Sequence, residues 1–347
     1  MNIKIVLDYL KNYDGEDITL MEICGTHTAS ISENAIASLL SDKIHLVSGP
    51  GCPVCVTVSS YVDRLCELAA QENNVIVTFG DMMRVPGAKG SLNDAKAEGA
   101  DVRMVYSPAE MIDIAKAEPD KNFVFSAVGF ETTTPAYALL LENAVEEHVK
   151  NLRLLTALKT MPPVIRSLCR SENKIDGFIA PGHVAAITGS NVFASLAKEF
   201  NLPFAVSGFS AEEILASIYA LVKMHGEGRS VNLYKSVVKE KRNEKATRIV
   251  EKYFEPCNTA WRGLGIIKDS GLVLREEFSH FDAGSKMLYS DDSHQKGCIC
   301  CEIITGVKKP YECPLYKKAC SPGQPKGACM VSNEGSCFNY FINDRND

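Results

Sequence analysis

The 347-residue sequence has no run of 18 or more uninterrupted apolar residues, the length that a membrane-spanning helix requires. Residues 1–17 scatter charges among their apolar positions and contain no small-residue cleavage site, unlike a secretory signal peptide. An excess of basic residues is also missing: 43 acidic and 37 basic residues give a net charge of −6, which argues against nucleic acid as the main partner. Apolar residues (46%) and charged residues (23%) are near the averages for globular proteins, which excludes disordered and rod-like chains. We therefore expect a folded cytoplasmic protein.

The common nucleotide and nucleophile motifs are absent as well. The sequence has no Walker A segment, no complete G-x-G-x-x-G, no C-x-x-x-C-x-x-C of a radical enzyme and no G-x-S-x-G elbow. Nucleotide-driven chemistry is therefore not expected.

Cysteine, by contrast, is abundant, with thirteen residues. In reducing surroundings structural disulfides are disfavoured, and such a large number of thiols points to metal or redox chemistry. Six cysteines are spread over the first 297 residues, and seven crowd the last fifty. This uneven distribution predicts two different thiol chemistries.

The first two-thirds of the chain alternate short β-branched runs with amphipathic stretches, a pattern typical of βαβ units that form parallel sheets. Apolar residues at helical spacing predict helices over 58–69 and 211–223. The predicted strands are 18–23, 44–47, 75–79, 102–106, 123–128, 152–158, 177–180 and 204–207.

Eight strands exceed what one small doubly wound unit needs. We therefore expect an α/β protein with two doubly wound parallel-sheet domains, residues 1–118 and 119–226, facing a central cleft. After Gly228 the pattern predicts a long basic helix, then a glycine-rich segment with few strands, then the cysteine cluster. Residues 227–347 are therefore expected to form a third, metal-organised domain. The basic residues between Lys223 and Lys252 are interpreted as a solvated helix face, with a partner-docking face as the alternative.

Several polar motifs follow predicted strands, where ligands bind in open α/β sheets. In GPGCPVC (49–55), Cys52 and Cys55 form a C-x-x-C pair between a strand and a helix that is expected to begin near Val56. A thiol at a helix N-terminus has a lowered pKa and acts as a nucleophile, a soft-metal ligand or half of a redox pair. The alternative is two buried cysteines that pack as small hydrophobic side chains.

The motif CGTHT (24–28) combines Cys24 with His27, so one helical turn would present a thiolate and an imidazole to the same ligand. Taken alone, such a Cys–His pair is more often structural. Its expected position beside the loop that holds Cys52 and Cys55 favours a functional role. Five further polar residues are weaker candidates for the cleft: Asp81, Arg84, Glu131, Thr132 and His183. The alternatives are a helix cap formed by Glu131 with the threonines that follow it, and an ion pair between Asp81 and Arg84.

The C-terminal cysteines Cys313, Cys320, Cys329 and Cys337 are single and widely spaced on loops. Four such thiolates suit tetrahedral zinc or a [4Fe-4S] cluster. Because zinc sites usually use paired C-x-x-C knuckles, the spacing favours the iron–sulfur cluster. The preceding Cys298 and Cys300 form a C-x-C pair that is either a redox dithiol or a set of alternative ligands.

Seven segments, taken together and in order, resemble the HypD family of [NiFe]-hydrogenase maturation factors: MEICGTHT, SGPGCPVCV, TFGDMMRVPG, VGFETTTPAYALL, GFIAPGHV, AWRGLG and CMVSNEGSC. The resemblance implies a scaffold on which the hydrogenase iron acquires two cyanides and one carbon monoxide, giving Fe(CN)2CO. It implies a HypC chaperone as partner, HypE as cyanide donor with HypF upstream, and the hydrogenase large subunit as an indirect partner.

Residue roles follow from the same resemblance. Cys24 would hold the iron together with a chaperone cysteine, with His27 beside it, and Cys52 and Cys55 would be a dithiol near the iron. The four cluster ligands would be Cys313, Cys320, Cys329 and Cys337. Two departures stand out: residues 208–211 read GFSA where the family has GFEP, and the usual C-x-C-G is extended by a third thiol, Cys301.

We expect a redox-active metallochaperone scaffold rather than a turnover enzyme, with electrons supplied through the cluster and the cysteine pair. The first alternative is an iron–sulfur dithiol oxidoreductase in which Cys52 and Cys55 cycle between thiol and disulfide. The second is a zinc-stabilised interaction protein.

Overall fold

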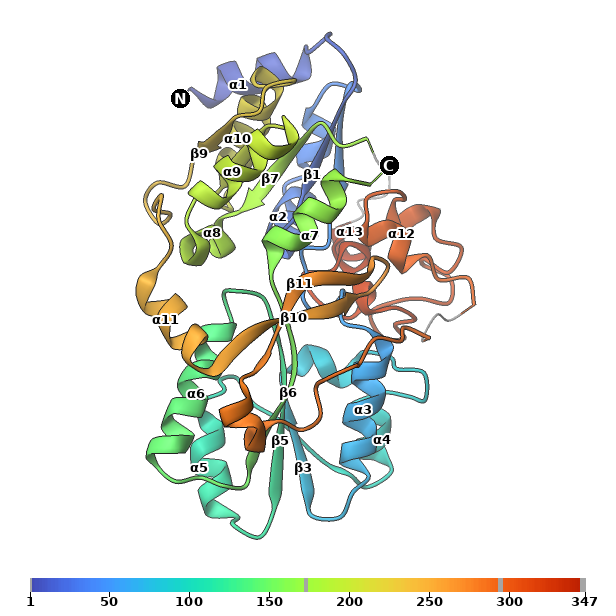
Figure 1. Ribbon diagram of the computed structural model, residues 1–347. Coiled ribbons are helices and arrows are strands. Elements are labelled where there is room, and N and C mark those ends of the chain that lie inside the picture. The colour runs from blue at the N-terminus through green and yellow to red at the C-terminus, as the bar shows by residue number, and fades with distance from the viewer. Residues whose placement is uncertain (1, 172–173, 293–295, 344–347) are drawn as a thin grey trace.

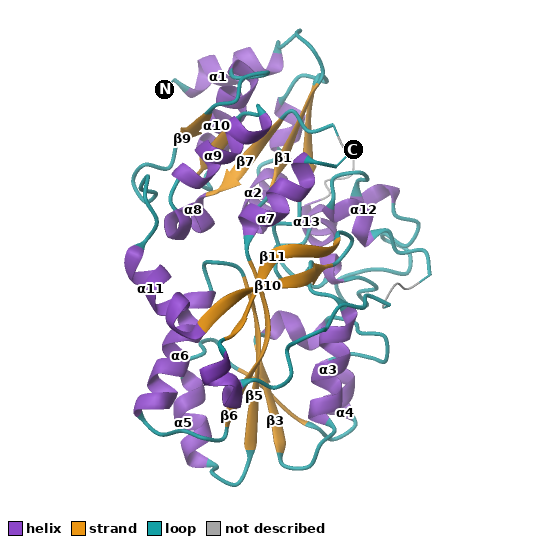
Figure 2. Ribbon diagram, viewed as in Figure 1, coloured by secondary structure: helices purple, strands orange, loops and turns teal. Residues whose placement is uncertain are grey.

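The structure is a computed structural model that describes residues 2–171, 174–292 and 296–343. It is a mixed α/β protein with two sheets, each dominated by parallel strands and flanked by helices (Figures 1 and 2). None of the helices in these described ranges is long and apolar enough to cross a membrane.

The first sheet is entirely parallel. Its strand order is β2 (Ile44–Ser48), β1 (Ile18–Glu22), β7 (Gly177–Pro181), β8 (Phe204–Ser207) and β9 (Ser230–Asn232). The central strands β7 and β8 are buried along their whole length, because helices cover both faces of the sheet. The covering helices are α1 (Ile3–Lys11) and α10 (Ala211–Lys223) on one face, and α7 (Met161–Cys169) and α9 (Asn191–Phe200) on the other.

The second sheet has six strands, and its first two pairings are antiparallel. Their order is β10 (Phe254–Trp261), β11 (Gly265–Leu274), β6 (Leu152–Lys159), β5 (Asn122–Gly129), β3 (Asn74–Thr78) and β4 (Asp101–Met104). Helix α3 (Ser59–Ala69) packs on one face, and α5 (Glu110–Ala117) and α6 (Thr134–Glu146) pack on the other.

The remaining helices are short and sit mainly in connections and in the C-terminal segment, residues 296–343. They are α2 (Gly25–Glu33), α4 (Leu92–Ala97), α8 (Gly182–Thr188), α11 (Glu244–Tyr253), α12 (Cys300–Ile304) and α13 (Ser336–Asn343). Short 3-10 helices occur at η1 (Ile36–Leu39), η2 (Gly80–Arg84), η3 (Glu276–Phe281), η4 (Pro310–Glu312) and η5 (Ala328–Met330).

All eight predicted strands are confirmed, each within two residues, and so are the helices predicted over 58–69 and 211–223. The long basic helix predicted after Gly228 is wrong. Only α11 is helical there, and it begins where the side chain of Asn243 accepts a hydrogen bond from the backbone N–H of Ala246. The residues before it form β9 and irregular chain.

The prediction of a segment with few strands after this helix is also wrong, because β10 and β11 form a long hairpin there. Polar residues and Pro256 interrupt the apolar pattern of β10. Proline is tolerated in this strand because β10 lies at the edge of its sheet, where its missing N–H breaks no ladder.

The sheets do not follow the boundaries expected after residues 118 and 226. Strands β1 and β2 lie beside β7 and β8, whereas β3 and β4 lie beside β5 and β6. Each sheet therefore takes strands from both sides of residue 118, and the β10–β11 hairpin from beyond residue 226 extends the second sheet. A parallel pair needs a long crossover, so the next strand along the chain need not be the partner in the sheet.

The C-terminal segment packs beside the place where the two sheets meet (Figure 1). Helix α13 lies against α2, and the Ser32 hydroxyl donates a hydrogen bond to the carbonyl of Asn339. The ammonium group of Lys309 donates to the carbonyl of Leu46 on β2. These contacts bring the C-terminal cysteines to the end of the first sheet.

Candidate thiol and metal centre

Cys24 follows β1 closely and occupies the N-cap position of α2. Its backbone N–H donates a 3.0 Å hydrogen bond to the Oε2 atom of Glu22, and the hydroxyl of Thr28 donates to Oε1 of the same carboxyl group at 2.5 Å. Burial raises the pKa of Glu22 to about 7. A buried carboxyl group thus ties the end of β1 to the first turn of α2 and fixes the backbone of Cys24.

The motif that contains Cys52 lies directly against Cys24. The backbone N–H of Gly25 donates a 3.0 Å hydrogen bond to the carbonyl of Gly51. A Cβ atom built on Gly51 would lie 2.3 Å from the nitrogen of Cys24, a distance that no side chain tolerates. The close approach of two backbones therefore joins the CGTHT and GPGCPVC motifs.

Cys52 and Cys55 are joined by a disulfide, with Cα atoms 5.2 Å apart. Both residues are buried, and they lie in a turn ahead of α3, whose N-cap is Val58. The prediction of a helix starting near Val56 is therefore wrong by three residues, and the pair does not lie in the first helical turn.

The thiol of Cys24 is also buried, at 8% exposure. Its pKa is raised to about 12, first by burial and then by the nearby carboxyl group of Glu334. The side chain is therefore a neutral thiol in the metal-free chain, and a bound cation would be needed to stabilise the thiolate.

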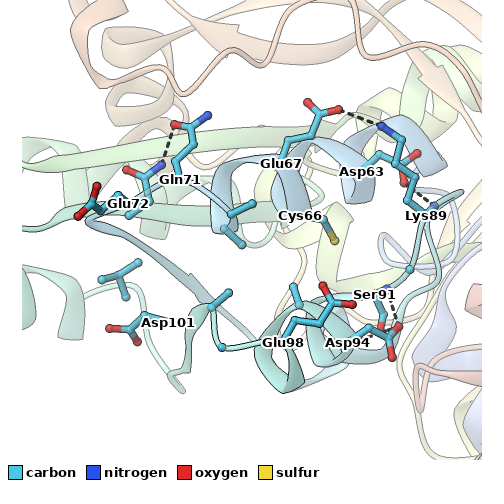
Figure 3. Close-up of a pocket in the computed structure, with 18 of the residues that line it drawn as sticks. Asp63, Cys66, Glu67, Gln71, Glu72, Lys89, Ser91, Asp94, Glu98 and Asp101 are labelled. Atoms are coloured by element: carbon cyan, nitrogen blue, oxygen red, sulfur yellow. Dashed lines mark hydrogen bonds and ion pairs between the residues drawn. The ribbon is translucent and has the colours of Figure 1, made fainter.

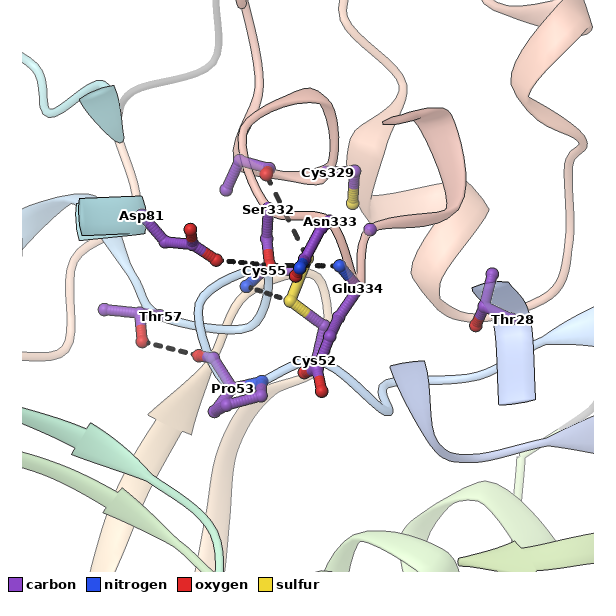
Figure 4. The surroundings of a disulfide bond; sticks show 12 residues. Thr28, Cys52, Pro53, Cys55, Thr57, Asp81, Cys329, Ser332, Asn333 and Glu334 are labelled. Carbon is purple, nitrogen blue, oxygen red and sulfur yellow. Dashed lines mark hydrogen bonds between the residues drawn. A yellow bond between two sulfur atoms is a disulfide. The ribbon is translucent and has the colours of Figure 1, made fainter. Parts of the chain in front are cut away.

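The C-terminal segment closes over the disulfide (Figure 4). The Cys55 sulfur lies 4.0 Å from the carbonyl oxygen of Ala328, the residue before Cys329. Glu334 lies so close to Gly25 that a Cβ atom built on this glycine would meet the Glu334 side chain at 2.3 Å. Three segments that are distant in sequence, 24–28, 49–55 and 328–335, therefore meet at one place.

The four predicted cluster ligands line one small cavity, together with Cys298 and Cys300. The lining cysteines are Cys298, Cys300, Cys313, Cys320, Cys329 and Cys337. The sulfur atoms of Cys300 and Cys329 are 3.0 Å apart, and burial raises the pKa of Cys337 well above its usual range. No group of three or more His, Cys, Asp or Glu side chains within 2–171, 174–292 and 296–343 has the arrangement of a metal-ion site. The donor set, six cysteine thiols around one cavity, nevertheless suits soft metals by its chemistry.

His27, on α2 after β1, and His183, on α8 after β7, both stack on Phe209. The distance between ring centroids is 4.8 Å for His27 and 3.9 Å for His183. One ring nitrogen of His27, Nε2, is 2.9 Å from the carbonyl oxygen of Gly208, and the other, Nδ1, has no hydrogen-bond partner among the described residues. Burial lowers the pKa of His27 to about 4, so the imidazole is neutral and Nε2 carries the proton that the carbonyl accepts.

The sequence departure at residues 208–211 forms the start of α10. The carboxyl group of Glu213 accepts hydrogen bonds from the backbone N–H groups of Phe209 and Ser210, and the Ser210 hydroxyl accepts one from the Glu213 N–H. This reciprocal capping box holds the loop that carries Phe209.

Asp81 and Arg84, from η2, both contact the C-terminal segment. The Ser332 hydroxyl donates to Asp81 at 2.8 Å, and the Arg84 guanidinium donates to the carbonyls of Pro322 and Val331. They therefore connect the second sheet to the loop around Cys329.

Glu131 and Thr132 have different surroundings. Thr132 is exposed, and α6 begins at Thr134 without a side-chain hydrogen bond from its N-cap. Glu131 is buried, and its Oε1 atom accepts a 2.8 Å hydrogen bond from the backbone N–H of Met161. The interpretation of Glu131 as part of a cap on the helix around Pro135 is therefore wrong, because its carboxyl group binds the first residue of α7.

Sequence reasoning missed Arg262 as a residue of this site. It is only 3% exposed, its backbone N–H donates to the carbonyl of Val56, and its Nε donates to that of Thr57. Arg262 thus links the β10–β11 turn to the loop after Cys55. The AWRGLG motif was the only sequence signal for it.

A separate hollow between α3 and α4 contains none of the predicted site residues (Figure 3). Several of its acidic side chains already have local partners: Asp63 accepts from the Ala88 N–H, Asp94 caps α4, and Glu67 pairs with Lys89. We assign these residues a structural role.

The HypD family model, described as the Hydrogenase formation hypA family, matches residues 2–344. The chain belongs to the HypD family. The HypD maturation factor of Rhizobium leguminosarum bv. viciae is 40% identical over 94% of this chain and 88% of its own length. The HypD maturation factors of Cupriavidus necator and Escherichia coli are each 37% identical, over 94% and 93% of this chain and 90% and 88% of their own lengths. The family resemblance seen in the sequence motifs is confirmed.

Proposed function

We propose that this HypD-family chain is a maturation scaffold for [NiFe]-hydrogenases. It holds an iron ion as cargo at Cys24, together with a thiol of a HypC-type chaperone, while cyanide and carbon monoxide are attached to form Fe(CN)2CO. The observation that carries the proposal is the convergence of Cys24, the Cys52–Cys55 disulfide and the loop before Cys329. The names of the HypD relatives, which are hydrogenase maturation factors, support it.

Thiolates suit this cargo because cyanide and carbon monoxide bind an electron-rich ferrous iron, which soft sulfur ligands favour. The Glu22 hydrogen bond and the contact with Gly51 hold the backbone of Cys24 in place before iron arrives. Since burial disfavours the free thiolate, Cys24 would ionise only as the cation binds.

Cys313, Cys320, Cys329 and Cys337 would hold a [4Fe-4S] cluster, with Cys298 and Cys300 as additional thiols at the same cavity. When bound, such a cluster supplies electrons one at a time. The chain's own disulfide lies next to the loop that carries Cys329, where a change in its redox state would alter the packing around Cys24.

The proposed partners are a HypC-type chaperone, HypE as the cyanide donor with HypF upstream, and indirectly the hydrogenase large subunit. We propose that the chain and these partners act in the cytoplasm.

The infrared spectrum of the protein purified without oxygen together with its chaperone tests the scaffold role. Metal-bound cyanide and carbon monoxide absorb where proteins do not. We expect these bands in the wild type and in a Cys169→Ala control, which removes a thiol on α7, and no bands in Cys24→Ala. Bands of equal strength in Cys24→Ala would refute Cys24 as the iron ligand.

Iron and acid-labile sulfide measured in the same preparations test the cluster. Cys329→Ala is expected to lose both, whereas Cys66→Ala, on α3, is expected to keep them. Zinc in place of iron and sulfide would favour the zinc-stabilised interaction protein.

The Cys52–Cys55 disulfide specifically favours a second candidate, an iron–sulfur dithiol oxidoreductase. The Cys24→Ala variant distinguishes the scaffold from the oxidoreductase. An oxidoreductase would keep its exchange with a dithiol substrate in this variant, whereas a scaffold would lose its bound iron.

A further inference from the structure

Lys159 ends β6 and is a buried lysine that the proposed function does not use. It is 2% exposed, its ammonium group donates a 2.8 Å hydrogen bond to the carbonyl of Ala260, and it lies 5.4 Å from the centroid of the Trp261 ring. Within the described residues, no Asp or Glu carboxylate lies within 4.0 Å of it. The carboxylate of Asp291 acts on Lys159 from beyond this distance and pairs with Arg262. A buried cation without a close countercharge is unfavourable, and burial lowers the pKa of Lys159 to about 7.

Lys159 lines a cavity of about 270 Å³ between β6, the β10–β11 hairpin and residues 285–289. At roughly 30 Å³ for each molecule of liquid water, the space suits a small polyatomic ligand rather than a monatomic ion. Its wall, among the described residues, contains a second lysine, Lys286, and no aspartate or glutamate. Cys257 also lines it, but burial raises the pKa of this thiol to about 11, so it adds no negative charge.

A second observation in the same wall points to a hydrogen-bonding ligand. Thr156 is 6% exposed, and its Oγ1 atom is buried without a hydrogen-bond partner among the described residues. A buried hydroxyl left in this state costs about 1–3 kcal/mol, so such groups usually have a partner. Thr156 lines the cavity together with Lys159.

We propose that this cavity binds a small oxyanion, a carboxylate, bicarbonate or phosphate, with its charge beside Lys159 and one oxygen accepting from the Thr156 hydroxyl. The anion supplies the close countercharge that Lys159 lacks. Lys286 adds attraction, because its side chain is largely exposed and its ion pair with the exposed carboxylate of Glu276 is long, at 4.0 Å.

This site is distinct from the thiol centre, because the cavity contains neither Cys24 nor the disulfide. The cavity is nevertheless close to the thiol centre along the chain. Thr57 lines the cavity two residues after Cys55, and the Thr57 carbonyl accepts the hydrogen bond from Arg262. An anion bound here would therefore lie behind the loop that carries the disulfide.

Thermal unfolding and titration calorimetry of the full chain test the proposal. The probes are sodium acetate, sodium bicarbonate and sodium phosphate, each compared with sodium chloride at the same pH and ionic strength. We expect at least one oxyanion to raise the unfolding temperature of the wild type beyond the effect of chloride. Lys159→Met should remove this response, and Lys268→Met, an exposed lysine on β11, should retain it.

The Thr156→Val variant keeps the shape of the side chain and removes one hydrogen bond, so we expect about a fivefold loss of oxyanion affinity. This variant also decides the matter if Lys159→Met fails to fold. The proposal is overturned if no oxyanion exceeds chloride, if Lys159→Met responds like the wild type, or if Thr156→Val binds with unchanged affinity. Which of the three anions binds most tightly distinguishes a carboxylate from a carbonate or phosphate ligand.

Discussion

Gly51 lies against the backbone of Cys24: a Cβ atom built on Gly51 would lie 2.3 Å from the Cys24 nitrogen and 2.6 Å from its Cα atom. The hydrogen bond from the Gly25 N–H to the Gly51 carbonyl fixes the same contact from the other side. The spacing between Cys24 and the Cys52–Cys55 pair thus depends on a residue without a side chain.

Gly51→Ala should therefore push the two motifs apart. We expect the free energy of unfolding to fall by about 1–3 kcal/mol, the usual cost of overpacking a close contact. Chemical denaturation measures this loss. Gly323→Ala is the matched control, because a Cβ atom built there meets nothing within 4 Å. Equal losses in both variants would show that the contact with Cys24 is not the cause.

Glu131 should make stability depend on pH. Burial raises its pKa from 4.5 to about 7, so the folded state holds the proton more tightly than the unfolded state does. Its stabilising contribution is complete below about pH 4.5 and is lost as the pH rises through about 7. Glu131→Gln keeps an acceptor for the Met161 N–H and cannot ionise.

We therefore expect the stability of the wild type relative to Glu131→Gln to fall by about 3 kcal/mol between about pH 4.5 and about pH 8. Denaturation curves at the two pH values measure the change. Glu146→Gln, an exposed position on α6, serves as the control and should show no such change. A relative stability that rises with pH would contradict the assignment.

Arg262 should contribute to stability through the loop after Cys55. Arg262→Met keeps much of the apolar side chain but leaves the Thr57 carbonyl without its Nε donor. We expect a loss of about 1.5–3 kcal/mol in the free energy of unfolding, the range for a buried hydrogen bond to a charged group. Arg229→Met removes an exposed arginine paired with Glu227, and its effect should stay below about 1 kcal/mol. Urea denaturation of the two variants measures both losses, and a loss in Arg262→Met no larger than that in Arg229→Met would contradict the role of the buried contact.

Ser210 should stabilise α10 through its capping box. Ser210→Ala removes the acceptor for the Glu213 N–H, and we expect a loss of about 1 kcal/mol. Ser195→Ala, at an exposed position inside α9, is the control and should change stability by less than about 0.5 kcal/mol. Indistinguishable unfolding midpoints would mean that the cap does not stabilise the loop at Phe209.

Most of the local elements and the family could be predicted from the sequence. Apolar periodicity located all eight βαβ strands and the helices α3 and α10, because burial of one helix face or of a whole parallel strand leaves a local pattern. It failed for β10 and β11, since an edge hairpin with a solvated face and a proline has no such pattern. The thiol motifs were equally visible, because cysteine spacing is a property of the chain.

The pairing of strands within each sheet and the contacts between distant loops became visible only in the folded chain. No local pattern shows that β1 lies beside β7, that Gly51 approaches Cys24, or that Cys298 and Cys300 share a cavity with the other cysteines. The partner of Glu131, a backbone N–H at Met161, leaves no trace in residue identity. Residue identity also does not reveal that Lys159 is buried with no carboxylate within 4.0 Å among the described residues. Burial and backbone contacts between distant segments depend on the path of the whole chain, whereas periodicity and motif spacing report only on neighbours in sequence.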